Sequence, residues 1–154
     1  MLFRSSLFNS PELDLEDAKD NLEDNGYSVS YNDDPSQVNV KETLTATYSD
    51  SFFSGAEETL NITVYEDSKS ASLAYDKLKI QKDVQKEFIE LQIQEYENIL
   101  KKYDDDLRSS ESDYYEDQIK DLEEQLEELE DAIIGKSGNT VWYGTKQAID
   151  DSKH

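Results

Sequence analysis

The chain has 154 residues and carries 37 Asp or Glu against 15 Lys or Arg, which gives a formal net charge of -22. It has no cysteine, so disulfides, thiolate nucleophiles and Cys-based zinc or iron–sulfur sites are excluded. The one histidine is the last residue, His154, which argues against a His-based general base or metal cluster. The negative charge repels phosphate and therefore argues against direct binding to nucleic acid.

The first predicted element is a helix that begins at Ser10 and Pro11, an N-cap residue followed by a proline suited to the first helical turn. Its apolar positions recur every three or four residues, and the pair Asn25-Gly26 marks its end. These apolar positions are Leu15, Ala18 and Leu22.

Three segments with alternating apolar and polar residues follow, which is the pattern of half-buried antiparallel strands. They run over residues 27–31, 43–48 and 59–64. The loop between the last two contains Phe52 and Phe53, an aromatic pair that packs at the edge of a core or anchors an interface. One face of such a sheet is apolar, so we expect helices to cover it.

A long helical pattern begins after Asp67 or Ser68, either of which can cap it. The pattern breaks near residues 108–112 and resumes as far as Ile134, where Gly135 and Gly138 are expected to end it. Residues 140–143 have the pattern of a last strand, and a short helix capped by Thr145 is expected over residues 145–149.

This order of elements predicts an α+β fold. We expect a small two-layer domain with an antiparallel sheet of about four strands, helices on one face, and a projecting antiparallel coiled-coil helical hairpin. Residues 1–83 and 136–154 would form the α+β body, and residues 84–135 would form the hairpin as an insertion into it.

The hairpin is predicted from two series of apolar residues spaced alternately by three and four, which is a heptad seam. The first arm contributes Ile89, Ile93, Tyr96, Leu100, Tyr103 and Leu107. The second arm contributes Tyr115, Ile119, Leu122, Leu126, Leu129 and Ile133. If the arms fold back on each other, these residues pair in six layers whose residue numbers always add to 222.

Two features of the arms are not explained by this pairing. Phe88, Leu91 and Ile99 form an apolar strip that the return arm cannot cover, so it would pack on the body or on a second copy. The predicted register also aligns a row of carboxylates beside the seam, where like charges lower stability. This row is either a screened, solvated surface or a docking edge for a basic partner. It consists of Glu90, Glu97, Asp104, Glu116, Glu123 and Glu130.

No motif for chemistry is present. The sequence has no phosphate-binding loop, dinucleotide fingerprint or nucleophile elbow, and the run 104–106 lacks the ligand spacing of a calcium loop. We therefore predict no catalytic residue, no cofactor-binding residue and no metal site. The lone Trp142 is expected to cover one sheet face against a helix, with an exposed ligand-binding aromatic as the alternative.

These observations predict a non-enzymatic interaction or structural and assembly protein that presents a coiled-coil arm. Its partner would be a protein, either a second copy or a basic protein. The alternative is an acidic inhibitor of the phage or mobile-element type, which imitates nucleic acid and occupies the basic groove of a nucleic-acid enzyme. No apolar run reaches the roughly 18 residues of a membrane span, and no signal peptide is recognisable. We therefore expect no membrane partner and a cytoplasmic location, unless an export signal has been trimmed.

Overall fold

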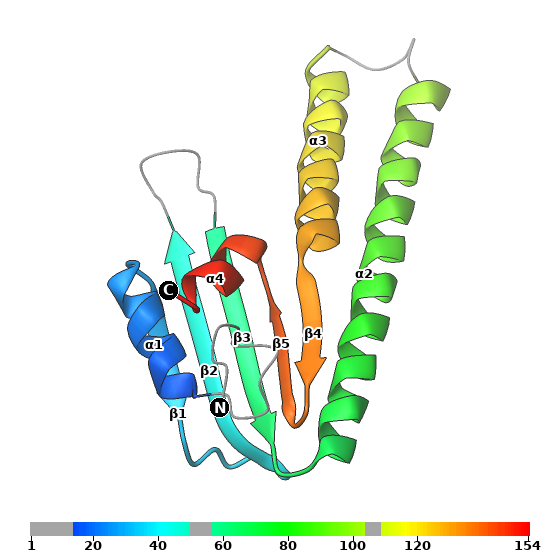
Figure 1. Cartoon of the computed structure of the whole chain (residues 1–154). Coiled ribbons are helices and arrows are strands. Elements are labelled where there is room, and N and C mark those ends of the chain that lie inside the picture. The colour runs from blue at the N-terminus through cyan, green and yellow to red at the C-terminus, as the bar shows by residue number, and fades with distance from the viewer. Residues whose placement is uncertain (1–13, 50–56, 104–108) are drawn as a thin grey trace. The chain divides into compact units, whose positions relative to one another are not determined.

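The structure is a computed structural model that describes residues 14–49, 57–103 and 109–154 (Figure 1). These residues form an α+β fold with a five-stranded antiparallel sheet, so the predicted fold class is confirmed. They separate into two compact units, and each is described by itself. The body comprises the described residues of Met1–Leu78 and Ala132–His154, and the helix pair comprises those of Lys79–Asp131.

The sheet has the strand order β1-β2-β3-β5-β4, with every neighbouring pair antiparallel. The three predicted N-terminal strands are present, and the predicted strand at 140–143 lies beside the third of them. Leu44 pairs with Ile62, which in turn pairs with Trp142, so three strands contribute side chains to one row. The bounds are β1 Ser28–Asn32, β2 Val40–Ser49, β3 Glu57–Tyr65, β4 Ile133–Ser137 and β5 Thr140–Gly144.

Two helices of the body, α1 (Leu15–Asp24) and α4 (Lys146–Asp151), pack on one face of the sheet and close the core (Figure 1). The period-2 alternation of the strands and the 3–4 spacing of α1 both point their apolar residues into it. The buried core residues are Leu15, Ala18, Leu22, Tyr27, Leu44, Ala46, Leu60, Ile62, Trp142, Ala148 and Ile149. The predicted Thr145 cap of α4 is confirmed, since its side chain accepts from the Ala148 N–H.

The predicted start of α1 is wrong. The helix begins at Leu15, and the Asp14 side chain caps it by accepting a hydrogen bond of 2.9 Å from the Glu16 N–H. Aspartate is as strong an N-cap as serine, and this start places Glu16 in the first turn, where the helix dipole favours a carboxylate. Ser10 and Pro11 lie outside the described residues.

The predicted end of the long helical region is also wrong, and this error hid the fifth strand. Helix α3 (Ser109–Asp131) ends at Asp131, and β4 then pairs with β5 through a tight turn. Gly138 has φ 58° at that turn, as a two-residue hairpin with glycine at its first central position requires. Gly135 belongs to the strand, and a Cβ there would lie 2.2 Å from the indole of Trp142. Both glycines therefore serve a hairpin, where helix termination had been expected.

Helix α2 (Ser68–Lys102) is capped by Asp67, one of the two predicted residues. The Asp67 carboxylate accepts from the Ser70 N–H at 2.7 Å and from the Ser70 hydroxyl at 3.2 Å. These hydrogen bonds hold the pKa of Asp67 below its usual value. The long helices α2 and α3 are consistent with the predicted hairpin.

Candidate interaction surface on the helix pair

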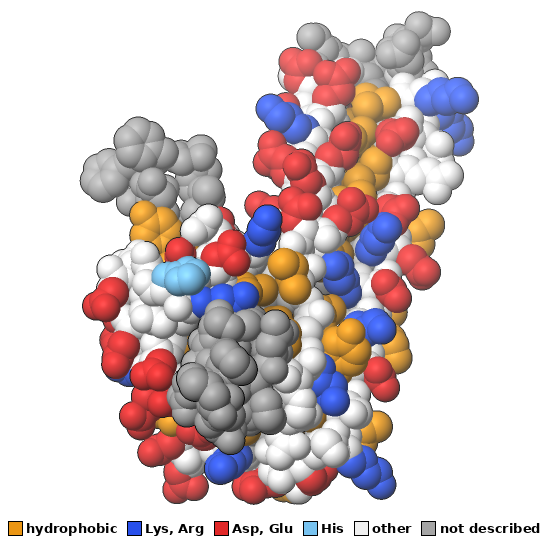
Figure 2. Space-filling model, in the orientation of Figure 1, with side chains coloured by type: hydrophobic (Ala, Val, Ile, Leu, Met, Phe, Trp, Pro, Cys, Tyr) orange, Lys and Arg blue, Asp and Glu red, His pale blue; other side chains and the backbone are white. Residues whose placement is uncertain are grey.

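Within the helix pair, α2 has two apolar faces on opposite sides. At 100° per residue, the seam residues Ile89, Ile93, Tyr96 and Leu100 fall within an arc of about 60°. They are half-buried, and Leu122 and Leu129 on α3 are buried with 9% of their surface exposed. Figure 2 shows the hydrophobic side chains gathered between the two helices. The seam is thus the internal face of the pair.

The opposite face of α2 carries a second apolar row, which we call the outer stripe: Ile80, Val84, Phe88 and Leu91. These four lie within an arc of about 80°, roughly opposite the seam. Their exposed fractions are 62%, 58%, 60% and 64%. Two of the predicted strip residues, Phe88 and Leu91, are therefore exposed as expected, whereas Ile99 is half-buried at the edge of the face. Sequence reasoning missed Ile80 and Val84, although their spacing of four continues through Phe88.

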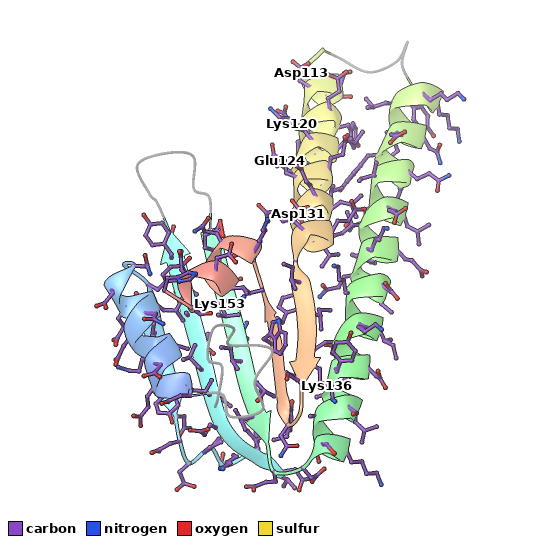
Figure 3. The ribbon with its side chains drawn as sticks, in the orientation of Figure 1. Asp113, Lys120, Glu124, Asp131, Lys136 and Lys153 are labelled. Atoms are coloured by element: carbon purple, nitrogen blue, oxygen red, sulfur yellow. The ribbon has the colours of Figure 1, made fainter. Side chains whose placement is uncertain are left out.

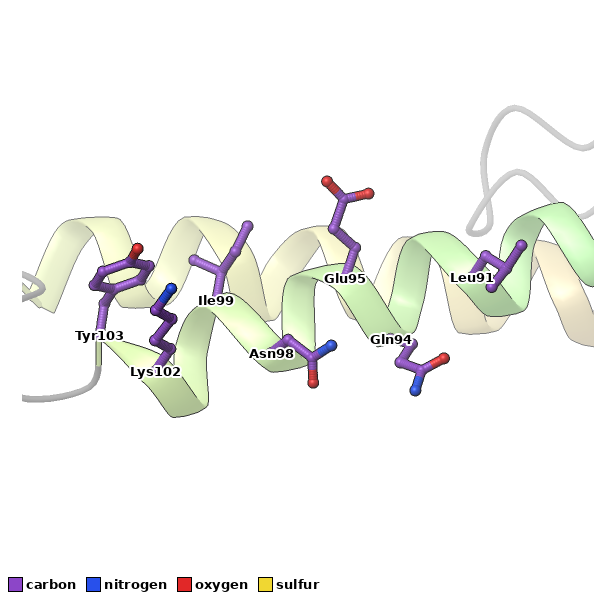
Figure 4. Close-up of a pocket in the computed structure, with 7 residues that line it drawn as sticks. All are labelled: Leu91, Gln94, Glu95, Asn98, Ile99, Lys102 and Tyr103. Atoms are coloured by element: carbon purple, nitrogen blue, oxygen red, sulfur yellow. The ribbon is translucent and has the colours of Figure 1, made fainter.

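A shallow groove continues the outer stripe toward the C-terminal end of α2, with a volume of about 560 Å³ (Figure 4). Leu91 and Ile99 supply its apolar part, and Glu95 stands between them on the same helix face. The groove is lined by Leu91, Gln94, Glu95, Asn98, Ile99, Lys102 and Tyr103. Because α3 contributes none of these residues, the groove faces away from the seam.

The two borders of the outer stripe differ in charge. One border, which we call the acidic border, carries the exposed residues Asp83, Glu87, Glu90 and Glu97. The other carries uncharged glutamines at 81, 85 and 92. Two of the predicted acidic-edge residues, Glu90 and Glu97, lie on this side of α2, about 100° and 120° around the helix from Leu91.

The predicted pairing of α2 with α3 is wrong in register. The rings of Tyr96 and Tyr115 lie 5.7 Å apart, and their residue numbers add to 211. The Lys82 Nζ donates to the Glu130 carbonyl at 3.3 Å, and Lys86 Nζ lies 3.5 Å from Glu130 Oε1. The residue numbers of these two pairs add to 212 and 216. A sum of 222 would separate the two tyrosines by about 16 Å along the helices. The last predicted layer also fails, because Ile133 belongs to β4.

A heptad repeat explains the error. Sliding one arm by seven residues leaves apolar residues facing apolar residues and lowers the residue sum by seven. A sum near 215 places Tyr96 opposite Ile119 and Tyr115 opposite Leu100, about one turn apart, which agrees with the ring contact. Leu107, the other end of the predicted seam, lies outside the described residues.

The predicted carboxylate row does not assemble as one edge. Glu116, Glu123 and Glu130 are all exposed on α3, but Glu130 has Lys86 of α2 beside it, not an acid. Asp104 lies outside the described residues. The register shift supplies the physical reason, because it moves lysines near the middle of α2 next to the end of α3.

Helix α3 instead carries its acids mainly on the side opposite the seam. Figure 3 shows Asp113, Glu124 and Asp131 along it, with Lys120 as a basic interruption. All eleven acidic residues of α3 are exposed, and the acidic side chains dominate this helix in Figure 2. The eleven are Glu111, Asp113, Glu116, Asp117, Asp121, Glu123, Glu124, Glu127, Glu128, Glu130 and Asp131.

Two tyrosines of the body have raised pKa values because of contacts that join neighbouring elements. The Tyr27 hydroxyl donates to Asp151 Oδ2 at 2.8 Å, and burial followed by this hydrogen bond raises the pKa of Tyr27. The Tyr31 hydroxyl donates to Glu42, and that bond, with a smaller effect of burial, raises the pKa of Tyr31. Both pairs tie neighbouring elements together.

The structure tests some of the remaining sequence predictions. Trp142 is 8% exposed within the core, so it covers the sheet as predicted, and the exposed-aromatic alternative is wrong. Phe52 and Phe53 lie outside the described residues.

Among residues 14–49, 57–103 and 109–154, no group of three acidic or histidine side chains is placed to hold a metal ion. In the same ranges, no helix combines the length and apolar character of a membrane span.

Comparison with known proteins gives no relative: no protein-family model, no curated protein and no solved structure matches the chain.

Proposed function

We propose that this is a non-enzymatic interaction protein whose helix pair binds another protein. One observation carries the proposal, the outer stripe of α2, where four large apolar side chains in succession are each about 60% exposed. Together they form a patch on the order of a few hundred Å², near the largest that soluble monomers usually expose. Apolar residues exposed singly need no explanation, but a row on one helix face marks an interaction site.

The free energy gained by burying the outer stripe is too small to hold a partner by itself. Full burial of such a side chain stabilises by about 1.5–3 kcal/mol, so burying the exposed part of four gives roughly 4–7 kcal/mol. Association costs an estimated 4–15 kcal/mol in lost freedom. The stripe therefore supports binding only when other contacts add to it, and the groove and the acidic border beside it are the available sources.

The proposal is tested by crosslinking in the native source followed by affinity capture of the full chain. The variant Phe88→Gln with Leu91→Gln removes half of the stripe at exposed positions, and Val38→Gln, at an 84% exposed site in the body, is its matched control. We expect a protein recovered with the wild type and with Val38→Gln but lost with the double variant. Equal recovery with all three, or recovery with none, would contradict the proposal.

A second candidate function is the acidic inhibitor that imitates nucleic acid, and the exposed acids of α3 favour it. Eleven carboxylates against Lys120 form a dense array on one helix, and such an array can occupy a groove built for phosphates. Binding to a nucleic-acid enzyme would then weaken steeply with salt and would compete with DNA or RNA. An affinity indifferent to salt would remove this candidate.

A further inference from the structure

The outer stripe and its borders define the chemistry of a partner more closely. We propose that this face of α2 binds an amphipathic helix of another protein whose apolar row is flanked on one side by Lys or Arg. This inference rests on the proposed function, since it assigns the partner of the same surface.

The geometry suits one helix. Ile80, Val84, Phe88 and Leu91 have the spacing i, i+4, i+8, i+11, and they extend about 16 Å along α2, or three turns. Apolar anchors at such intervals are those by which an amphipathic helix packs lengthwise against an apolar face. The groove from Leu91 to Tyr103 prolongs the surface by about three further turns.

The charges set the orientation of that helix. Asp83, Glu87 and Glu90 lie on one side of the stripe, where Lys79 and Lys86 are the basic residues among them, while the other side offers glutamine amides. A bound helix with basic residues on one flank would place them beside these carboxylates and would be repelled if turned over. The acidic border thus supplies both attraction and choice of orientation.

The same charges disfavour an antiparallel second copy. Two antiparallel α2 helices can match their stripes by placing Ile80 opposite Leu91 and Val84 opposite Phe88 of the other copy. That alignment brings Asp83 of each copy beside Glu90 of the other, so the contact between like charges occurs twice. Like charges at positions flanking a helix seam oppose pairing, so an antiparallel pair of this chain that matches the stripes does not match the charges.

The test uses the full chain and three designed helical peptides of equal length and composition of apolar residues. The first has leucines at the spacing of the stripe and lysines along one flank. The second carries glutamates in place of those lysines. The third has the composition of the first with the leucine spacing scrambled. Calorimetry should show the first binding at least about tenfold tighter than the other two.

Matched variants locate the site. Phe88→Gln with Leu91→Gln should weaken binding of the first peptide about tenfold, and Val38→Gln should leave it unchanged. Asp83→Lys with Glu90→Lys should reverse the preference in favour of the glutamate peptide. Glu124→Lys with Asp131→Lys on α3 makes the same change in net charge and should alter affinity less than about threefold, because these residues lie on the other helix. Far-UV circular dichroism checks that each variant stays helical.

Three outcomes would overturn the inference. Equal binding of the scrambled peptide would show charge attraction without recognition. Equal effects of the two charge-reversal variants would show that the acidic border is not the contact. A wild-type dimer in sedimentation, lost in the Phe88→Gln and Leu91→Gln variant, would make a second copy the occupant. If the native partner is captured through the stripe but is not a basic helix, the proposed function stands and this inference fails.

Discussion

The body and the helix pair use the same sequence pattern in opposite ways. In α1 of the body, Leu15, Ala18 and Leu22 recur at helical spacing and are at most 1% exposed, because the sheet lies against them. In α2, residues of the outer stripe recur at similar spacing, and each is about 60% exposed. Periodicity thus determines which residues share a face, whereas a second element of the fold determines whether that face is buried. The contrast separates the part of the chain that provides stability from the part available for binding.

The largest expected effect tests this contrast in stability. Leu60→Ala, at a fully buried position in β3, should lower the free energy of unfolding by about 2–5 kcal/mol, because it removes apolar contacts and leaves a cavity. Leu91→Ala, at a 64% exposed position, should change it by less than about 0.5 kcal/mol. Urea unfolding of both variants measures the two values. A comparable loss in Leu91→Ala would show that the outer stripe is covered in solution.

A smaller effect concerns the tyrosine that links the strands to the C-terminal helix region. Tyr27→Phe removes the hydrogen bond to Asp151 and should cost about 1–2 kcal/mol at neutral pH. The folded-state pKa of Tyr27 is raised, so the wild type keeps this contribution below the usual pKa of 10.0 and loses it as the pH rises further.

The measurement is the stability of wild type and variant at several pH values from neutral to 11. Tyr27→Phe should have a shallower alkaline decline than the wild type, and Tyr31→Phe should behave in the same way, because the Glu42 hydrogen bond raises its pKa. Alkaline declines of identical slope in all three proteins would rule out these tyrosines as the cause.

Engineered cysteines should change stability least, and they report the register of α2 against α3 directly. The chain has none of its own, so pairs can be placed freely. Lys82→Cys with Glu130→Cys should be joined within one molecule by a dithiol reagent of about 8 Å, because Lys82 reaches the Glu130 carbonyl. Gln92→Cys with Glu130→Cys matches the register predicted from the sequence and would be joined only if that register were correct. In the structure its members are offset along the helices by about 10 Å or more.

The sequence predicted the body better than the helix pair for physical reasons. Strands such as those around Leu44 and Ile62 alternate with a period of two, and a shift by one residue would turn the whole apolar set to the wrong face. A heptad seam has no such constraint, since a slide of seven residues leaves Tyr96 and Leu122 still facing apolar side chains. The predicted register of α3 was therefore wrong, although its seam residues as far as Leu129 were right.

The missed strand and the missed stripe have separate causes. Ile133 continues the heptad spacing of α3, and this outweighed the Ser-Gly-Asn-Thr turn that signals a hairpin at Gly138. The packing of Trp142 over Gly135 is a tertiary contact, and no local sequence pattern predicts it. The outer stripe was predicted only in part, because Ile80 and Val84 precede the seam, which begins at Ile89.

Because Trp142 packs on Gly135, its fluorescence can also be used to follow unfolding. Trp142 is the only tryptophan in the chain, and it belongs to the body. Excitation at the red edge of indole absorption avoids the ten tyrosines, so the emission follows the core of the body. Far-UV circular dichroism instead weights the long helices of the pair. Recording the two signals through one denaturation would show whether the units melt in one step or in two, without any label.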